Sequence, residues 1–362
     1  MVSTKRTSLG DFMQQSLDKK TSRGLYKSWP SQHLRSLHFL PLLLRSHLPP
    51  YQALLMPVFQ VPILNGKIRR TSDITLNDHG GFGDVFAGEY DDGQTTCTVA
   101  VKVLRPRFKN DRPVTRDNGQ RREIKLWKCL FHPNIVPLLG LTTDFEDPNP
   151  FRPNLPGIVS PWMRNGNLLT YVKGRNLDIA QLLKLLCDVA TGLAYLHSSL
   201  IIHGDLTPAN VLIDEKHNAC LTDFGLSTLT GGLEDTSYWT STIGGAMRWR
   251  APELVPEIGY APTTHFVPRL TTECDIYSYG QIVLQIISGE LPYYNIKHPE
   301  CIRLELFKRN RPNRPVHCGR LTDEYWALVN KCWGETPGAR PSATEVLTDV
   351  NGLHCNALAR LV

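Results

Sequence analysis

The clearest hydrophobic pattern in the chain lies between residues 178 and 198. Apolar residues recur there at positions 179, 182, 183, 186, 189, 190, 193 and 196. This is the 3.6-residue spacing of an amphipathic α-helix, and Asp178 is of the residue type that caps a helix at its N-terminus. The sequence therefore predicts a helix with one buried face, which begins after Asp178 and carries the chain towards His203.

A second helical pattern lies within residues 121–131, in the first half of the chain. Ile124, Trp127 and either Leu130 or Phe131 fall on one face at helical spacing. We expect these apolar residues to form the buried side of a helix, with the charged residues before them on its other side.

Two short runs rich in apolar and β-branched residues lie before this helix. They are residues 74–76 and 98–103, and each is typical of a β-strand. The second run alternates and carries one charged side chain, Lys102. A solvated lysine at the edge of a strand is the common interpretation of such a residue, and a lysine that binds phosphate is the alternative.

Residues 1–70 differ in composition from the rest of the chain. The first fifty contain eight Lys or Arg and two Asp, so they carry the whole formal charge of +6. The apolar run at residues 37–44 is broken by Pro41 and is shorter than the roughly 20 residues that span a membrane. We therefore expect residues 1–70 to be a basic, proline-broken, disordered tail and no membrane span. The basic, acid-poor start also fits a mitochondrial presequence, which is the alternative.

The remainder of the chain is neutral. A protein that binds nucleic acid needs a concentrated basic face, so this neutrality argues against a nucleic-acid partner. Of the 362 residues, 41% are hydrophobic and 20% are charged, which is typical of a globular protein. The nine cysteines include no Cys-x-x-Cys pair, a usage typical of reduced thiols, so we expect a cytoplasmic or a nuclear location.

The candidate chemistry is concentrated in residues 203–225. Asp205 is followed five residues later by Asn210, and then by Asp223 in an Asp-Phe-Gly triplet. This spacing suits phosphoryl transfer, in which one carboxylate accepts the proton of a substrate hydroxyl while an amide and a second carboxylate bind Mg²⁺. Asp and Asn at this spacing are by themselves more often part of a turn in which they bond their own backbone. The second acid, at the right distance, favours phosphoryl transfer.

A glycine-rich segment follows the first predicted strand. It contains Gly80, Gly81 and Gly83, with Val85 two residues after the last of them. Glycines allow a turn to lie close to phosphates, so that backbone N–H groups face the phosphate oxygens. Alone, the segment is typical of a simple glycine hairpin, and a cover over a bound nucleotide is the alternative.

These motifs share their order with those of protein kinases. Residues 78–85 resemble the loop G-x-G-x-x-G-x-V, residues 99–102 resemble V-A-I-K, and residues 203–210 with 223–225 resemble H-R-D-L-x-x-x-N and D-F-G. Ala-Pro-Glu ends the next segment at residues 251–253, and Arg340 resembles the late arginine that pairs with this glutamate, here Glu253. Over residues 73–350 the chain resembles a eukaryotic protein kinase domain.

The residues before Ala-Pro-Glu indicate a subgroup within that family. Met247-Arg248-Trp249-Arg250 looks like the corresponding segment of the tyrosine-kinase-like group. The His-Gly-Asp sequence of the catalytic loop is similar to that of fungal-type members. Members of this group mostly phosphorylate Ser and Thr.

The resemblance implies an α+β fold, the bilobal protein kinase fold. We expect a small N-lobe with five strands and one main helix at about residues 71–163. A larger, mainly helical C-lobe is expected at about residues 164–350, and residues 351–362 form the C-terminal end. The implied ligands are ATP, bound between the lobes, and Mg²⁺. The implied partner is a protein substrate.

The same resemblance implies roles for individual residues. Asp205 is expected to orient and deprotonate the substrate hydroxyl, Lys102 to hold the α- and β-phosphates, and Glu123 to fix Lys102. Mg²⁺ is expected on Asn210 and Asp223. The residues expected to surround the nucleotide are Gly80, Gly81, Gly83, Val85, Ala100, Lys102, Ser160, Pro161, Met163 and Leu212.

Four positions depart from the family pattern. Asp78 replaces the first glycine of the loop, and Gly204 replaces an arginine that clamps a phosphorylated activation loop. Thr207 replaces a lysine beside the γ-phosphate, and Ala246 replaces a threonine that contacts this lysine. The resemblance implies an ATP-dependent protein kinase acting on Ser or Thr hydroxyls. The departures leave a weak or inactive pseudokinase, which acts as a nucleotide-binding scaffold, as the alternative.

Overall fold

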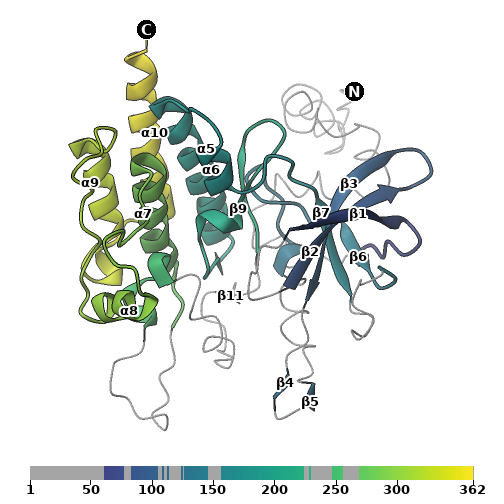
Figure 1. Ribbon diagram of the computed structural model, residues 1–362. Helices are drawn as coiled ribbons and strands as arrows, with labels where there is room; N and C mark the ends of the chain where they lie inside the picture. The colour runs from purple at the N-terminus through teal and green to yellow at the C-terminus, as the bar shows by residue number, and fades with distance from the viewer. Residues whose placement is uncertain are drawn as a thin grey trace, which may run out of the picture. The chain divides into compact units, whose positions relative to one another are not determined.

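The computed structural model describes residues 61–76, 83–104, 108–109, 112–113, 124, 126–145, 156–223, 228–229, 247–255 and 269–361. Within them, an antiparallel sheet precedes a set of helices along the chain (Figure 1). This is the α+β, two-lobed arrangement that the sequence predicts. Residues 1–60 of the expected tail lie outside the described residues.

The N-lobe is built on a five-stranded antiparallel sheet with the strand order β1-β2-β3-β7-β6. Its strands are β1 (Ile68–Leu76), β2 (Gly83–Asp91), β3 (Thr96–Leu104), β7 (Gly157–Pro161) and β6 (Gly140–Thr142). A separate small hairpin pairs β4 (Phe108–Lys109) with β5 (Arg112–Pro113). The five strands confirm the expected number.

The central strand β3 has two different faces. Val99, Val101 and Val103 are buried in a hydrophobic cluster that belongs to the sheet. Because side chains alternate along a strand, Ala100 and Lys102 lie on the opposite face. The sheet therefore directs Lys102 away from the N-lobe's own core.

The C-lobe contains the six α-helices that the structure bounds. They are α5 (Leu168–Lys173), α6 (Ile179–Ser198), α7 (Thr272–Ser288), α8 (Pro299–Phe307), α9 (Asp323–Cys332) and α10 (Ala343–Ala359). Four single-turn 3₁₀ helices are η2 (Pro208–Asn210), η5 (Met247–Trp249), η6 (Pro252–Leu254) and η7 (Pro337–Ala339). Two short strand pairs join β8 (Ile201–Ile202) to β11 (Thr228–Leu229), and β9 (Val211–Ile213) to β10 (Ala219–Leu221).

Helix α6 forms as its periodicity predicts. Asp178 accepts a hydrogen bond from the backbone of Gln181, whose side chain bonds back to Asp178, so the N-terminus carries a complete capping box. Its apolar stripe is buried against α10, α7 and β10. Among the described helices, α6 is long and apolar enough in composition to cross a membrane. The buried core helix of a globular protein meets the same criterion, so this composition decides nothing about a membrane.

The segment from Trp127 to Val136 joins the two lobes. Trp127 is 3% exposed and donates from its indole Nε1 to the carbonyl of Val136 at 2.6 Å. The backbone of Val136 then donates to Leu221 at 2.9 Å, and Leu221 donates to Asn134 at 2.9 Å. These bonds tie the N-lobe to the strand that precedes Asp223.

The folded domain extends beyond both expected boundaries. Leu64 is buried, and its backbone N–H bonds to the carbonyl of Leu141 at 2.7 Å. Strand β1 begins at Ile68, and α10 continues to Ala359. Residues 61–70, expected in the tail, are therefore part of the sheet lobe. Most of residues 351–362 belong to the last helix.

A buried ion pair closes the C-lobe as the sequence predicts. Arg340 donates to both carboxylate oxygens of Glu253, at 2.5 and 2.9 Å. The Arg340 side chain is 1% exposed and also donates to the carbonyl of Glu273 at 3.0 Å. A two-pronged bond between arginine and carboxylate fixes both distance and orientation. The pair thus anchors the Ala-Pro-Glu segment against α7.

Candidate active site

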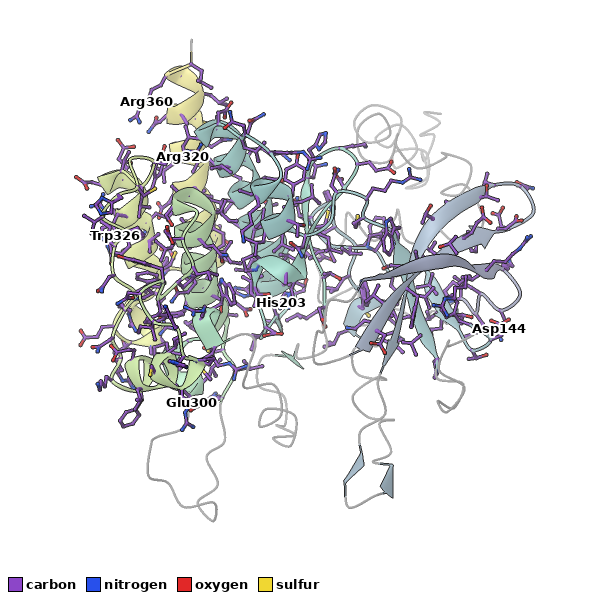
Figure 2. The ribbon with its side chains drawn as sticks, in the orientation of Figure 1. Asp144, His203, Glu300, Arg320, Trp326 and Arg360 are labelled. Atoms are coloured by element: carbon purple, nitrogen blue, oxygen red, sulfur yellow. The ribbon has the colours of Figure 1, made fainter. Side chains whose placement is uncertain are left out.

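The catalytic loop begins where β8 ends, and it is held by one buried carboxylate. Asp275, near the start of α7, accepts hydrogen bonds from the backbone N–H groups of His203 and Gly204, both at 2.9 Å. His197 Nε2 lies 2.9 Å from the same carboxylate. Asp275 is 1% exposed, so these bonds act away from competing water. Figure 2 shows His203 on the side of the helical lobe that faces the sheet, far from Asp144.

Gly204 occupies a backbone conformation that favours glycine. Its φ is +81°, in the left-handed region where a residue with a Cβ is strained. The residue type therefore suits the conformation, while it removes the side chain that an arginine would offer at this position. The loop keeps its shape through Asp275 and loses a cationic group.

Asp205 and Asn210 are brought together by the turn η2 between them. The amide nitrogen of Asn210 donates to the backbone carbonyl of Asp205 at 2.7 Å and lies 3.4 Å from its carboxylate. Burial and the nearby charge of Asp223 raise the pKa of Asp205 to about 6, against the opposing effects of His203, Arg250 and Asn210. A carboxylate whose pKa lies closer to neutrality is a better proton acceptor than an ordinary aspartate.

Lys102 and Asp223 meet across the two lobes. Lys102 Nζ lies 2.9 Å from Asp223 Oδ1, and the two side chains are 13% and 24% exposed. Asp223 follows β10 and has a φ of +63°, an uncommon conformation for a residue with a side chain. Such conformations persist where the surrounding structure enforces them, often at functional sites.

The strand register places three further predicted nucleotide residues on the face of Lys102. Val85 pairs with Lys102 across β2 and β3, and Ser160 pairs with Ala100 across β7 and β3. Because directly paired residues point to the same side of a sheet, these four side chains share the face of Lys102. This face is the one turned away from the sheet's own hydrophobic cluster.

Three more predicted residues lie in or just after β7 and in the hairpin of β9 and β10. Pro161 ends β7, opposite Val99, and Met163 follows two residues later, partly buried against the main core. Leu212 lies in β9, also partly buried against that core. Their contact with a nucleotide stays a prediction.

Several predicted site residues lie where the structure gives no description. Gly80, Gly81 and Glu123 lie outside the described residues, as do Asp78 and Ala246. Gly83 is the first residue of β2. The expected pairing of Glu123 with Lys102 therefore stays a prediction.

The residues expected to bind Mg²⁺ have suitable donor atoms. The amide nitrogen of Asn210 donates to the carbonyl of Asp205. The side-chain oxygen of Asn210 is the atom that could bind the metal ion. Thr222, next to Asp223, donates its backbone N–H to the carbonyl of Asn210 at 3.0 Å. Amide and carboxylate oxygens are ligands that Mg²⁺ prefers, and it typically takes its other ligands from substrate phosphates and water.

Two residues with a place in this site were not identified from the sequence. Asp275 received no role there, although it holds the catalytic loop. Arg250 appeared only as part of a subgroup motif, yet it is 8% exposed. Burial lowers the pKa of the Arg250 guanidinium, and the charge of Asp205 opposes this effect. An arginine directly before Ala-Pro-Glu was the available signal.

Arg248, two residues before Arg250, has a different environment. Its guanidinium donates to the backbone carbonyls of Pro292, Tyr293 and Ile296 at 2.7, 3.0 and 2.9 Å. These bonds occupy it in holding the loop after α7. Arg248 is therefore a structural residue and no substitute for an arginine at position 204.

Comparison with known proteins agrees with this geometry. Residues 75–350 match the family model described as protein tyrosine and serine/threonine kinase. The probable serine/threonine-protein kinase drkD of Dictyostelium discoideum is 30% identical over 278 residues, which are 76% of this chain and 19% of that protein. The serine/threonine-protein kinase STY17 of Arabidopsis thaliana is 30% identical over 277 residues, 76% of this chain and 43% of that protein.

A further relative has a name that includes tyrosine. The serine/threonine/tyrosine-protein kinase HT1 of Arabidopsis thaliana is 28% identical over 253 residues, 69% of this chain and 58% of that protein. The chain thus spans less than two thirds of each of these relatives. These relatives are of the tyrosine-kinase-like type that the segment at residues 247–250 indicates. The family model covers about three quarters of the chain, and the chain belongs to the protein tyrosine and serine/threonine kinase family.

Proposed function

We propose that this protein is an ATP-dependent protein kinase that transfers the γ-phosphate to Ser or Thr hydroxyls of protein substrates. The contact that carries the proposal is the 2.9 Å approach of Lys102 Nζ to Asp223 Oδ1. It joins the predicted phosphate-binding residue of the N-lobe to a predicted metal ligand of the C-lobe. Asp205 and Asn210 are hydrogen-bonded to each other in the same lobe as Asp223.

The proposed mechanism assigns each of these groups one task. Lys102 holds the phosphates of ATP in place, and Asp205 receives the proton of the substrate hydroxyl as its oxygen attacks the γ-phosphorus. Asn210 and Asp223 hold Mg²⁺, which when bound neutralises charge on the phosphates. Asp275 holds the backbone of the catalytic loop, so that Asp205 needs little reorganisation during the reaction.

The substrate class rests on the relatives. The relatives are named as serine/threonine kinases, a serine/threonine/tyrosine kinase and a dual specificity kinase. We propose a protein substrate with Ser or Thr as the acceptor, and a cytoplasmic location. The neutral charge outside the first fifty residues supports the proposal that nucleic acid is not a partner.

The alternative of an inactive pseudokinase scaffold receives no support. The relatives are named as kinases. Lys102, Asp205, Asn210 and Asp223 are all retained, and the contacts of Lys102 with Asp223 and of Asn210 with Asp205 support the kinase proposal.

The experiment combines nucleotide binding with identification of the product. At 100 times its dissociation constant, Mg-ATP should stabilise the protein by about 2.7 kcal/mol. Lys102→Met and Asp223→Asn should reduce this thermal shift. With γ-labelled ATP and a mixed protein acceptor, the label should appear on phosphoserine or phosphothreonine. Binding without any transfer would contradict the kinase proposal and favour the scaffold.

A further inference from the structure

The catalytic loop borders a small cavity that contains one positive charge. Residues 204–207 line one side, residues 249, 250 and 254 line another, and residues 274, 275 and 278 of α7 complete it. Among these lining residues, Asp205 and Asp275 are acidic and Arg250 is the basic one. Thr207, whose side chain is neutral, is 7% exposed.

The Arg250 guanidinium lies in the same cavity lining as Asp205, whose negative charge acts on it. Only 8% of the residue is exposed. No hydrogen bond or ion pair joins its side chain to another group in the described part of the chain. Arginine stays charged and carries five N–H donors. Because no hydrogen bond to a described residue uses these donors, they are available to a ligand in the cavity.

The backbone on both sides of Arg250 is firmly held. The carbonyl of Trp249 accepts a hydrogen bond from Ser278 Oγ at 2.8 Å, and its indole donates to Gln285 at 3.1 Å. Glu253, three residues after Arg250, is clamped by Arg340. Arg250 therefore projects from a short rigid segment that is fixed to α7 at one end and to Arg340 at the other.

We propose that Arg250 is a further catalytic residue, whose guanidinium contacts the γ-phosphoryl group during its transfer to the hydroxyl held by Asp205. This inference rests on the proposed kinase function. Negative charge is spread over the phosphoryl oxygens in such a transition state, and a fixed cation beside it lowers the barrier. Among the residues that line the cavity, Arg250 supplies such a cation, whereas Thr207 on the catalytic loop is neutral.

The balance of the step is that of an ordinary phosphoryl transfer. The hydroxyl oxygen forms a new bond to the γ-phosphorus, and the bond from that phosphorus to the β,γ-bridging oxygen breaks. The electron pair of the broken bond leaves with ADP, and the hydroxyl proton passes to Asp205. Arg250 keeps its proton throughout and donates hydrogen bonds to the phosphoryl oxygens.

The test is steady-state kinetics of Arg250→Met and Arg250→Lys on a peptide acceptor. Arg250→Met should lower kcat about 100-fold, as loss of a single preorganised donor does, while KM for ATP and for peptide change less than about threefold. Arg250→Lys should keep part of the lost rate. Because Arg250 makes no hydrogen bond or close ion pair with the described residues, and only the charge of Asp205 attracts it, Arg250→Met should melt close to the unmodified protein.

A rescue experiment separates catalysis from structure. Added millimolar guanidinium should raise kcat of Arg250→Ala about tenfold, on the order of what one charged hydrogen bond contributes. It should leave kcat of the matched control Arg248→Ala unchanged, because that arginine bonds only backbone carbonyls.

Three results would overturn the inference. One is a kcat of Arg250→Met within about threefold of the unmodified protein, and another is the absence of rescue by guanidinium. The third is that Arg250→Met keeps its kcat and raises KM only for peptides that contain acidic residues. Arg250 would then bind an acidic side chain of the substrate. If the unmodified protein transfers no phosphate at all, the proposed function fails as well.

Discussion

Replacing Asp275 with asparagine alters one atom at a position that is 1% exposed. The two carboxylate oxygens of Asp275 accept separate N–H groups, from His203 and Gly204, at 2.9 Å each. An asparagine offers one oxygen and one NH₂ group. One backbone N–H would therefore keep an acceptor that is now neutral, and the other would face a second donor.

The expected loss of stability follows from these two bonds. A hydrogen bond to a charged group contributes about 1.5–3 kcal/mol, and a buried donor without an acceptor costs about 1–3 kcal/mol. We expect Asp275→Asn to destabilise the protein by about 3 kcal/mol. The entropy of unfolding is about 2.1 cal/mol/K per residue. For the 276 residues of the family match, a loss of about 3 kcal/mol corresponds to a fall in Tm of about 5 °C.

Differential scanning calorimetry measures this change directly. The matched control is Asp178→Asn, which replaces the N-cap of α6 by a residue that caps about equally well. The control should stay within about 0.5 kcal/mol of the unmodified protein. A Tm of Asp275→Asn that equals the Tm of the control would refute the account of how the catalytic loop is held. The kinase rate should also fall, because small displacements of catalytic groups reduce rates about 100-fold.

Three further predictions concern the ion pair, pH and regulation. Arg340→Met should lower the free energy of unfolding, measured by urea denaturation, by about 3–5 kcal/mol, because it leaves Glu253 buried without its partner. Arg360→Met removes an exposed ion pair and should lower it by less than about 1 kcal/mol. Equal losses for the two variants would contradict this account. Burial lowers the pKa of His132 from 6.5 to about 4, so between these pH values the unfolded chain binds a proton that the folded chain does not. The free energy of unfolding should therefore fall by about 2 kcal/mol from pH 7 to pH 5. If a His132→Asn variant lost as much stability over this range, His132 would be excluded as the cause. Because Gly204 offers no side chain to a phosphate, phosphatase-treated protein should keep most of its kinase rate, and a hundredfold fall would show that another residue clamps the activation loop.

Local patterns were sufficient to predict helix α6. Its periodicity, its cap and its burial all depend on residues close in sequence, and the structure confirms each of them. The resemblance of ordered motifs added the five-stranded sheet and the pairing of Arg340 with Glu253. These features were predictable because each motif carries its own conformational requirement.

Features that depend on distant backbone contacts were not predictable. Residues 61–70 were assigned to the tail because their order comes from bonds to Leu141, almost eighty residues away. Asp275 was overlooked because it accepts hydrogen bonds from two backbone N–H groups. Every residue except proline has such a group, so these bonds leave no pattern in the sequence. The burial of Arg250 depends on α7 and on the catalytic loop together, and a charged residue in a loop is ordinarily solvated.

The central claim is that Asp205 accepts the hydroxyl proton in a phosphoryl transfer from ATP. The direct test is the rate of γ-phosphate transfer to a protein acceptor by the unmodified protein and by Asp205→Asn, with Asp178→Asn as control. A general base contributes about 10²–10⁴-fold, so Asp205→Asn should lose at least about 100-fold in rate. The control should keep its rate, and all three proteins should keep the Mg-ATP thermal shift. Equal rates for Asp205→Asn and the unmodified protein would contradict the assignment of Asp205 as the base.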